Sequence, residues 1–156
     1  MTKKKSNTKG RFKLVSAVHL VLVKDGNILL LRRFNTGYRD GDYSVIAGHL
    51  DGGKQARMAM SREAKEEAGI EVAPEDLKLV HLMHRQSAEE RVDFFFTATK
   101  WSGKPKIMEP DKCDELKWVP IKSLPGNMVP YVKAGIQNFL NGRTYSEFGW
   151  VKPDLE

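Results

Sequence analysis

Residues 48–70 of the chain read GHLDGGKQARMAMSREAKEEAGI. Glu63, Glu66 and Glu67 place three carboxylates within five residues, directly after Arg62. Folding alone gives a chain little reason to crowd like charges, because they repel one another. The pattern therefore indicates a site where a cation holds the carboxylates together.

The residues from Lys54 to Ala68 have the composition of a helix. They contain neither proline nor glycine and are mostly alanine, methionine, glutamate, lysine and arginine, which are good helix formers. Gly69 follows at the position where a helix C-terminus favours a left-handed residue. At about 100° per residue, one side of this helix carries Ala56, Ala59, Met60, Glu63 and Glu67.

Two glutamates thus share a side with small apolar residues, and that side should face the protein. An unpaired carboxylate there is costly, and divalent cations such as Mg²⁺ take oxygen ligands from carboxylates, phosphates and water. We therefore predict a metal site that includes Glu63 and Glu67, with Glu66 beside them. The competing interpretation is a solvated acidic face with an ordinary i,i+4 pair between Arg62 and Glu66.

The wider spacing favours the metal site. The order is Gly48, thirteen residues, Arg62-Glu63, two residues, Glu66-Glu67, one residue and Gly69. This order resembles the signature of the Nudix hydrolases, with Ala64 and Ile70 at its aliphatic positions. The family's first glutamate, six residues after the glycine, is replaced here by Lys54. A lysine there would neutralise part of the acidic cluster or reach a substrate phosphate.

The resemblance implies an α/β fold, a Nudix-type α/β/α sandwich with a mixed sheet, over roughly residues 14–142. It also implies hydrolysis of a nucleoside diphosphate linked to another group, with Mg²⁺ as the cofactor and Mn²⁺ as a substitute. By position in the motif, the implied catalytic and metal-site residues are Arg62, Glu63, Glu66 and Glu67, with the Ala47 carbonyl as a backbone ligand and Gly48 and Gly69 as structural residues. In this scheme Glu66 is a ligand or the general base, and Arg62 orients the glutamates. The family often adds an acid from a later loop, for which the candidates are Glu109, Asp111, Asp114 and Glu115.

Residues that would select the substrate lie outside the motif. A polar loop before the motif holds Arg32, Arg33, Phe34, Tyr38 and Arg39. Arginines bind phosphates bidentately and aromatic rings stack on bases. We therefore predict that the substrate, a nucleoside triphosphate or another nucleoside diphosphate linked to X, is bound by Arg32, Tyr38, Arg39 and Lys54. His84-Arg85, at a strand end, is a weaker candidate.

The net charge of +6 is concentrated at the N-terminus, because Lys3, Lys4, Lys5, Lys9, Arg11 and Lys13 all precede the first acid. We predict that residues 1–13 form a disordered basic tail and that residues 14–156 form a single domain. Since the excess charge is confined to a tail, we expect a small-molecule nucleotide rather than nucleic acid as the partner. A homodimer stays open.

The chain contains no apolar run of the kind found in secretory signals and no stretch of roughly 20 apolar residues. We therefore expect a cytoplasmic protein without a membrane partner. Cys113 is the single cysteine, so an internal disulfide is excluded. A buried thiol is the expected role of Cys113.

Hydrophobic periodicity predicts the order of the elements along the chain. A hairpin is expected first, followed by a short strand that leads into the motif helix, three more strands and a closing helix. The expected ranges are 15–23 and 28–31 for the hairpin, 43–47, 77–85, 91–101 and 115–119 for the other strands, and 129–140 for the last helix. Phe94, Phe95 and Phe96 are expected in the core, and residues 145–150 are left without an assignment.

Three functions are consistent with these patterns. The leading hypothesis is a Mg²⁺-dependent pyrophosphohydrolase acting on a nucleotide. A diphosphate isomerase of the same superfamily would need a reactive cysteine, for which Cys113 is the one candidate. A sensor module for a nucleotide or ADP-ribose is the third, because Lys54 breaks the motif. The three intact glutamates favour an enzyme over the sensor.

Overall fold

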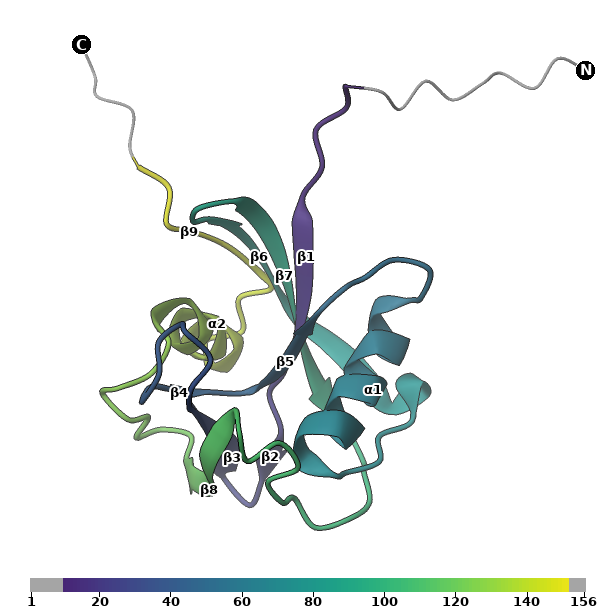
Figure 1. The fold of residues 1–156 in the computed structure, drawn as a ribbon, viewed down its shortest axis with the longest axis vertical. Helices are drawn as coiled ribbons and strands as arrows, with labels where there is room; N and C mark the ends of the chain where they lie inside the picture. Colours follow the sequence, from purple (N-terminus) through teal and green to yellow (C-terminus); the bar gives the residue numbers. More distant parts are fainter. Residues whose placement is uncertain (1–9, 152–156) are drawn as a thin grey trace, which may run out of the picture.

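A computed structural model describes residues 10–151 of the chain. Within this range two α-helices, α1 (Ala56–Ala68) and α2 (Pro130–Leu140), flank two β-sheets, with α1 on the right and α2 on the left of Figure 1. The first sheet has five strands in the order β5-β1-β7-β6-β9. These strands are β1 (Val15–Leu20), β5 (Ile46–His49), β6 (Leu77–Gln86), β7 (Glu90–Ala98) and β9 (Tyr145–Phe148).

The second sheet has four strands, in which β3 is the central element. Strands β2, β4 and β8 all pair with β3 in antiparallel orientation. The first sheet is mixed, because β1–β7 and β6–β9 are parallel whereas β1–β5 and β6–β7 are antiparallel. The strands of the second sheet are β2 (Val23–Lys24), β3 (Asn27–Arg33), β4 (Tyr43–Ser44) and β8 (Cys113–Pro120). The expected α/β architecture with a mixed sheet is confirmed.

The predicted hairpin of residues 15–23 and 28–31 is only half correct. The chain leaves the first sheet at Val21, whose N–H donates to the Phe96 carbonyl. It enters the second sheet at Leu22, whose carbonyl accepts from the N–H of Leu29. Because Leu20, Val21 and Leu22 are all buried, this apolar run crosses between the sheets instead of ending one strand of a hairpin. Only β2 and β3 form the hairpin.

The predicted strand at residues 43–47 is also divided between the sheets. Tyr43 and Ser44 pair with β3, whereas Ile46 to His49 pair with β1. Val45 between them is buried. This crossing brings β5 and the start of the motif beside α1, and therefore places the motif at the junction of the two sheets.

Each helix covers its own part of the core. The inner side of α1 contributes Ala59 and Met60, as its periodicity predicts, and also Ala64 and Ala68. On α2, Gly135 packs so closely on the ring of Phe95 that a Cβ atom there would overlap it. Phe95 and Phe96 are buried and Phe94 is half-buried, in line with the expected core.

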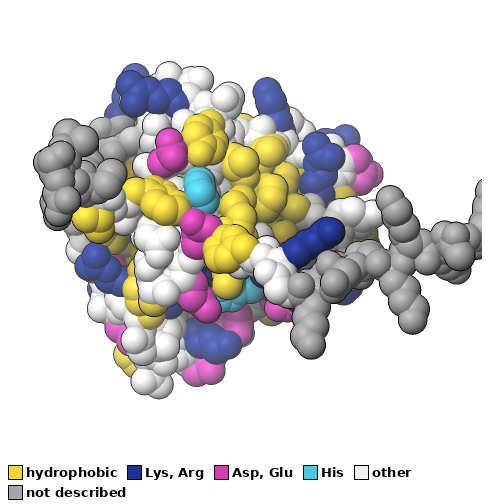
Figure 2. Space-filling model, turned by 90° about the horizontal axis from the view of Figure 1, so that it is seen from above, with side chains coloured by type: hydrophobic (Ala, Val, Ile, Leu, Met, Phe, Trp, Pro, Cys, Tyr) yellow, Lys and Arg dark blue, Asp and Glu magenta, His cyan; other side chains and the backbone are white. Residues whose placement is uncertain are grey.

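The segment without an assignment, residues 145–150, contains the edge strand β9. This strand alternates exposed and half-buried residues, so it lacks the apolar pattern by which a sequence reveals a strand. Residues 1–9 of the predicted tail lie outside the described range. Among residues 10–151 no helix is long and apolar enough to cross a membrane. Seen from above, the molecule has hydrophobic side chains gathered near the middle of the face (Figure 2).

Candidate active site

The motif helix α1 directs Glu63 and Glu67 toward β5. Helix α1 ends at Gly69, which adopts the left-handed conformation (φ 66°) and donates its N–H to carbonyls of the last turn. Strand β5 approaches α1 so closely that a Cβ atom on Gly48 would overlap the Glu63 carboxylate. Gly48 is therefore required to leave room for Glu63, which is consistent with the structural role predicted for this glycine.

Of the carboxylates in the motif, Glu67 has the most strongly shifted pKa. Its pKa is raised to about 8, first by burial and then by the nearby carboxylates of Glu63 and Glu109. The Ala47 N–H, 3.3 Å from Glu67 Oε2, and the guanidinium of Arg33 oppose this rise. Burial also raises the pKa of Glu63. Glu67 is thus short of compensating positive charge, whereas Glu63 has the guanidinium of Arg62 beside it.

Arg62 lies between the other two glutamates of the motif. Its Nη2 donates to Glu63 Oε1 at 3.1 Å, and its Nε is 3.8 Å from Glu66 Oε1. The Glu66 side chain is 55% exposed, whereas that of Glu63 is 13% exposed. Arg62 therefore holds Glu63 in position, as expected for an orienting residue, and Glu66 is the most solvent-accessible of the three carboxylates.

The three glutamates are neighbours without converging on one point. Within residues 10–151, no three His, Cys, Asp or Glu side chains are close enough to form a ready-made metal cluster. Glu63 and Glu66 form ion pairs with Arg62, and Glu67 accepts a hydrogen bond from the Ala47 amide. This arrangement keeps the mutually repelling carboxylates apart. The all-oxygen donor set, the desolvated Glu67 and the space left by Gly48 nevertheless fit a hard divalent cation.

Glu67 lies at the edge of a cavity of about 480 Å³, which we call the acidic cavity. Glu109 lines it too and raises the pKa of both Glu63 and Glu67. Of the four late acids, Glu109 is thus the one that shares a site with α1. Asp114 and Glu115 instead form ion pairs with Arg32, and Asp111 is exposed outside the cavity.

Cys113 also lines the acidic cavity. Burial raises the pKa of its thiol, and Sγ donates to the Glu115 carbonyl at 3.3 Å. A reactive cysteine requires a lowered pKa and a cationic neighbour. The environment of Cys113 therefore favours the buried thiol over the nucleophile that an isomerase would need.

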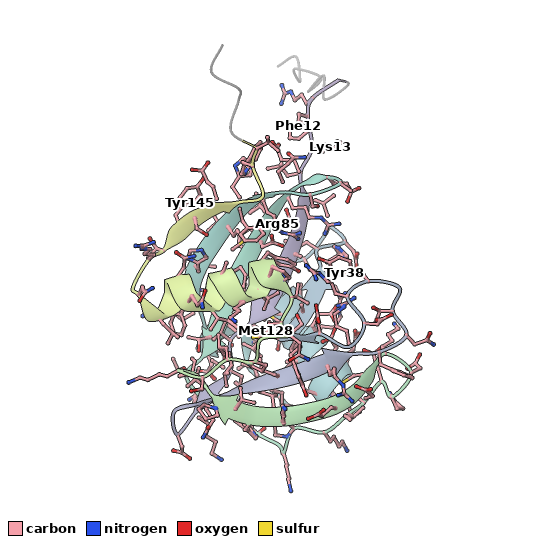
Figure 3. All side chains as sticks on the ribbon, turned by 90° about the vertical axis from the view of Figure 1, so that its left-hand side faces the viewer. Phe12, Lys13, Tyr38, Arg85, Met128 and Tyr145 are labelled. Carbon is pink, nitrogen blue, oxygen red and sulfur yellow. The ribbon has the colours of Figure 1, made fainter. Side chains whose placement is uncertain are left out.

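A second cavity, of about 510 Å³, adjoins the first at Arg33, Ala47 and His49. We call it the arginine cavity, because Arg33, Arg85 and Arg91 line it and no carboxylate does. Tyr38 and Tyr131 add two aromatic rings. Figure 3 shows Arg85 above α2, with Tyr38 in the loop to its right.

The floor of the arginine cavity is a buried polar network. Arg85 forms a bidentate pair with Asp93, at 2.7 and 3.3 Å, and its guanidinium lies 3.6 Å from the centre of the Tyr131 ring. His19 Nε2 is 3.0 Å from the Tyr131 hydroxyl, and burial lowers the His19 pKa to about 4. His19 is therefore neutral at pH 7. Its Nδ1 is buried without a hydrogen-bond partner, as is Nε of Arg91 at the cavity wall.

The predicted substrate-binding residues separate into two groups. Tyr38 lines the arginine cavity, where the Arg33 guanidinium lies 5.2 Å from its ring centre. Arg32 borders the acidic cavity, but its Nε and Nη2 are occupied by Asp114 at 2.8 and 3.0 Å. Arg39 is 3.5 Å from Asp42 and lines neither cavity. Lys54 is exposed and also lies outside both cavities. Arg39 and Lys54 thus lie outside both cavities, and their contact with a substrate stays a prediction.

Sequence reasoning missed His19, Asp93 and Tyr131 as cavity or network residues and ranked Arg85 low. Their signal in the sequence is a polar residue inside an otherwise apolar strand or helix, which is hard to distinguish from an exposed position. Arg33 was singled out in the loop but not predicted to bind substrate, although it lines both cavities.

The profile of the NUDIX domain matches residues 13–139, so the chain belongs to the Nudix hydrolase family. Among curated proteins, it is 28% identical over 111 residues to "NAD-capped RNA hydrolase NudC" of Pseudomonas putida. It is 24% identical over 106 residues to the protein of the same name from Stutzerimonas stutzeri. The aligned region spans 71% and 68% of this chain, but only 38% and 37% of these relatives.

Solved structures share the fold. The MutT NUDIX hydrolase from Burkholderia pseudomallei superposes with a TM-score of 0.73 at 25% identity, covering 81% of this chain and 98% of that one. The E. coli ORF135 protein has a TM-score of 0.71 at 20% identity, covering 83% of this chain and 90% of that one. The expected sandwich fold is thus found in proteins of similar length.

Proposed function

We propose that the chain hydrolyses the diphosphate linkage of a nucleotide substrate with the help of a divalent cation. The observation that carries this proposal is the placement of Glu67. Its carboxylate is desolvated beside Glu63 and Glu109, and within residues 10–151 its one hydrogen bond is with the Ala47 amide. A carboxylate in such surroundings is costly unless a cation neutralises it.

Glu63 and Glu67 would hold the cation, and the Ala47 carbonyl, Glu66 and Glu109 are the further oxygen donors at the junction of α1, β5 and the acidic cavity. A divalent cation held there supplies positive charge to a diphosphate and lowers the pKa of water. Mg²⁺ and Mn²⁺ match a donor set made of oxygen alone. Family membership supports this choice.

The protein groups around this position have separable roles. Arg62 keeps Glu63 oriented through the 3.1 Å hydrogen bond. Glu66, the most exposed carboxylate of the motif, has access to solvent and is suited to accept the proton of the attacking water. Arg33 lines both cavities; its Nε and Nη2 donate to the Tyr38 carbonyl and the Thr36 hydroxyl at 2.7 and 3.0 Å, which leaves Nη1 to donate to a phosphoryl oxygen.

The arginine cavity would hold the rest of the substrate. Arg85 and Arg91 of this cavity are already paired with Asp93 and Glu89, so its available positive charge comes mainly from Arg33 and favours an anionic or acceptor-rich group. Tyr38 and Tyr131 offer rings for a base or sugar. The aligned relatives are named NAD-capped RNA hydrolases. This name supports a nucleotide joined through a diphosphate as the substrate class.

The test is a product screen over nucleoside triphosphates, dinucleotides, sugar nucleotides and nucleotide-capped oligonucleotides, with Mg²⁺ and with chelator. Each product is identified by mass. We expect at least one compound to be cleaved within its diphosphate, with Mg²⁺ and not with chelator. Cleavage outside a diphosphate, or no cleavage of any compound in the panel, would contradict the proposal.

A further inference from the structure

A hollow of about 770 Å³ lies apart from the two cavities, where β2, the end of β7 and β8 meet. Trp101 and Trp118 line it together with Lys24, Lys100 and Lys104. Among residues 10–151, no aspartate or glutamate lines it. The hollow therefore combines aromatic surface with positive charge of a single sign.

The two tryptophans are arranged as a stack. Their ring centres are 6.1 Å apart with an interplanar angle of 23°, and both side chains are half-buried. Lys24 Nζ lies 5.8 Å from the centre of the Trp101 ring. Packing on the core accounts for the inner faces of the rings. Lys24, Lys100 and Lys104, which line the same hollow, are exposed and add positive charge beside the rings.

The lysines of the hollow are weakly neutralised. Lys100 Nζ is 4.0 Å from Asp76 with 79% of its side chain exposed, so this ion pair is loose. Within residues 10–151, neither Lys24 nor Lys104 forms a salt bridge with an acidic side chain. The positive charge of the hollow is thus available to an external anion.

We propose that this hollow, the Trp101–Trp118 hollow, binds single-stranded nucleic acid. Sites for single strands combine aromatic rings, on which bases stack, with a basic groove that follows the phosphates. Acidic peptides and anionic lipids would use the lysines but would leave the ring pair without a flat partner. The proposal does not depend on the hydrolase activity, because it concerns a separate surface.

The hollow lies along the chain path that leads to the acidic cavity. Strand β8 runs from Cys113 in the acidic cavity to Trp118 in the hollow, a distance of about 17 Å for five residues of strand. The segment between β7 and β8, at the bottom of Figure 1, lines the hollow with Lys104 and the acidic cavity with Glu109 and Lys112. A strand bound in the hollow would therefore lie within a few nucleotides of the motif.

The test is a fluorescence-anisotropy titration of a labelled ten-nucleotide uridine oligomer with the full chain in chelator, which prevents hydrolysis. The test variant carries Lys24→Gln, Lys100→Gln and Lys104→Gln together. The matched control also removes three positive charges, two just before β1 and one just before β9. It carries Arg11→Gln, Lys13→Gln and Arg143→Gln. A Trp101→Leu variant probes stacking, and its fold is checked by circular dichroism.

We expect the lysine variant to bind at least ten-fold more weakly at low salt, with a salt dependence reduced by about two in log–log slope. Trp101→Leu should weaken binding at least five-fold, since each base–aromatic stack contributes substantially to affinity. The control should bind like the wild type. No measurable binding by the wild type, an equal loss in the control, or equal binding to phosphatidylserine vesicles through the same lysines would overturn the proposal.

Discussion

Replacement of Glu67 by glutamine should stabilise the metal-free protein while it abolishes turnover. Glutamine keeps the shape of the side chain and an oxygen that accepts from the Ala47 N–H. It removes the charge whose burial raises the pKa of Glu67 to about 8. A side chain whose charge lowers the stability of the fold is typical of a functional site.

The sign and size follow from proton linkage. Because the folded-state pKa of Glu67 lies above the unfolded value of 4.5, the stabilisation by the bound proton is complete below pH 4.5 and is lost as the pH rises through about 8. Each pKa unit corresponds to about 1.36 kcal/mol, so ionised Glu67 costs the metal-free fold on the order of a few kcal/mol. In a chain of 156 residues this corresponds to a Tm difference of roughly 5–10 °C at pH 8 and to little at pH 5.

The assay is thermal unfolding in chelator, followed by circular dichroism, at pH 5 and pH 8. Glu66→Gln is the matched control, because its side chain is 55% exposed and its charge is solvated. Addition of Mg²⁺ should raise the Tm of the wild type more than that of Glu67→Gln, because the cation then neutralises Glu67. A Tm gain that is the same at both pH values, or a loss at pH 8, would refute the reasoning.

Two further predictions concern the motif loop. Gly48→Ala should lower turnover strongly and stability by about 1–3 kcal/mol, because its Cβ atom displaces the Glu63 carboxylate; turnover like that of the wild type would show that the position of Glu63 is unimportant. Lys54→Glu should lower the Mg²⁺ concentration for half-maximal activity, since it replaces a repelling charge by an attracting one. An unchanged Mg²⁺ titration with a raised Michaelis constant would instead place Lys54 on a substrate phosphate.

The sequence was most informative where local periodicity decides the structure. The predicted helix ends at Ala68 with left-handed Gly69, and Glu63 and Glu67 lie on the inner side together with Ala59 and Met60. Phe95 and Phe96 of β7 are in the core as predicted, and half-buried Phe94 packs against it. These features depend on neighbours within one or two helical turns or strand residues, which the sequence shows directly.

Features that depend on distant parts of the chain were not accessible in this way. The buried run through Leu20, Val21 and Leu22 reads equally well as one strand, and only its partners, Phe96 and Leu29, reveal the crossing between sheets. The arginine cavity draws His19 from β1, Arg85 from β6 and Tyr131 from α2, which meet only in the folded chain.

For the same reason, the sequence alone does not show which of the four late acids lies near the motif. Glu109 and Asp114 are similar in sequence context, and the ion pair of Asp114 with Arg32, 82 residues away, separates their roles. The local group of lysines is hidden in the sequence for another reason. Net charge describes the whole chain, and it does not report a local group of lysines around Trp101 and Trp118.

The central claim, that Glu63 and Glu67 hold a divalent cation on which diphosphate hydrolysis depends, is tested most directly by one titration. The initial rate of hydrolysis of a cleaved substrate is measured against Mg²⁺ concentration for the wild type and for Glu63→Gln. We expect saturable activation of the wild type, full inhibition by chelator, and a rate at least 100-fold lower for the variant at saturating Mg²⁺, an effect of about 2.7 kcal/mol. Hydrolysis that continues in chelator, or a variant as fast as the wild type, would contradict the claim.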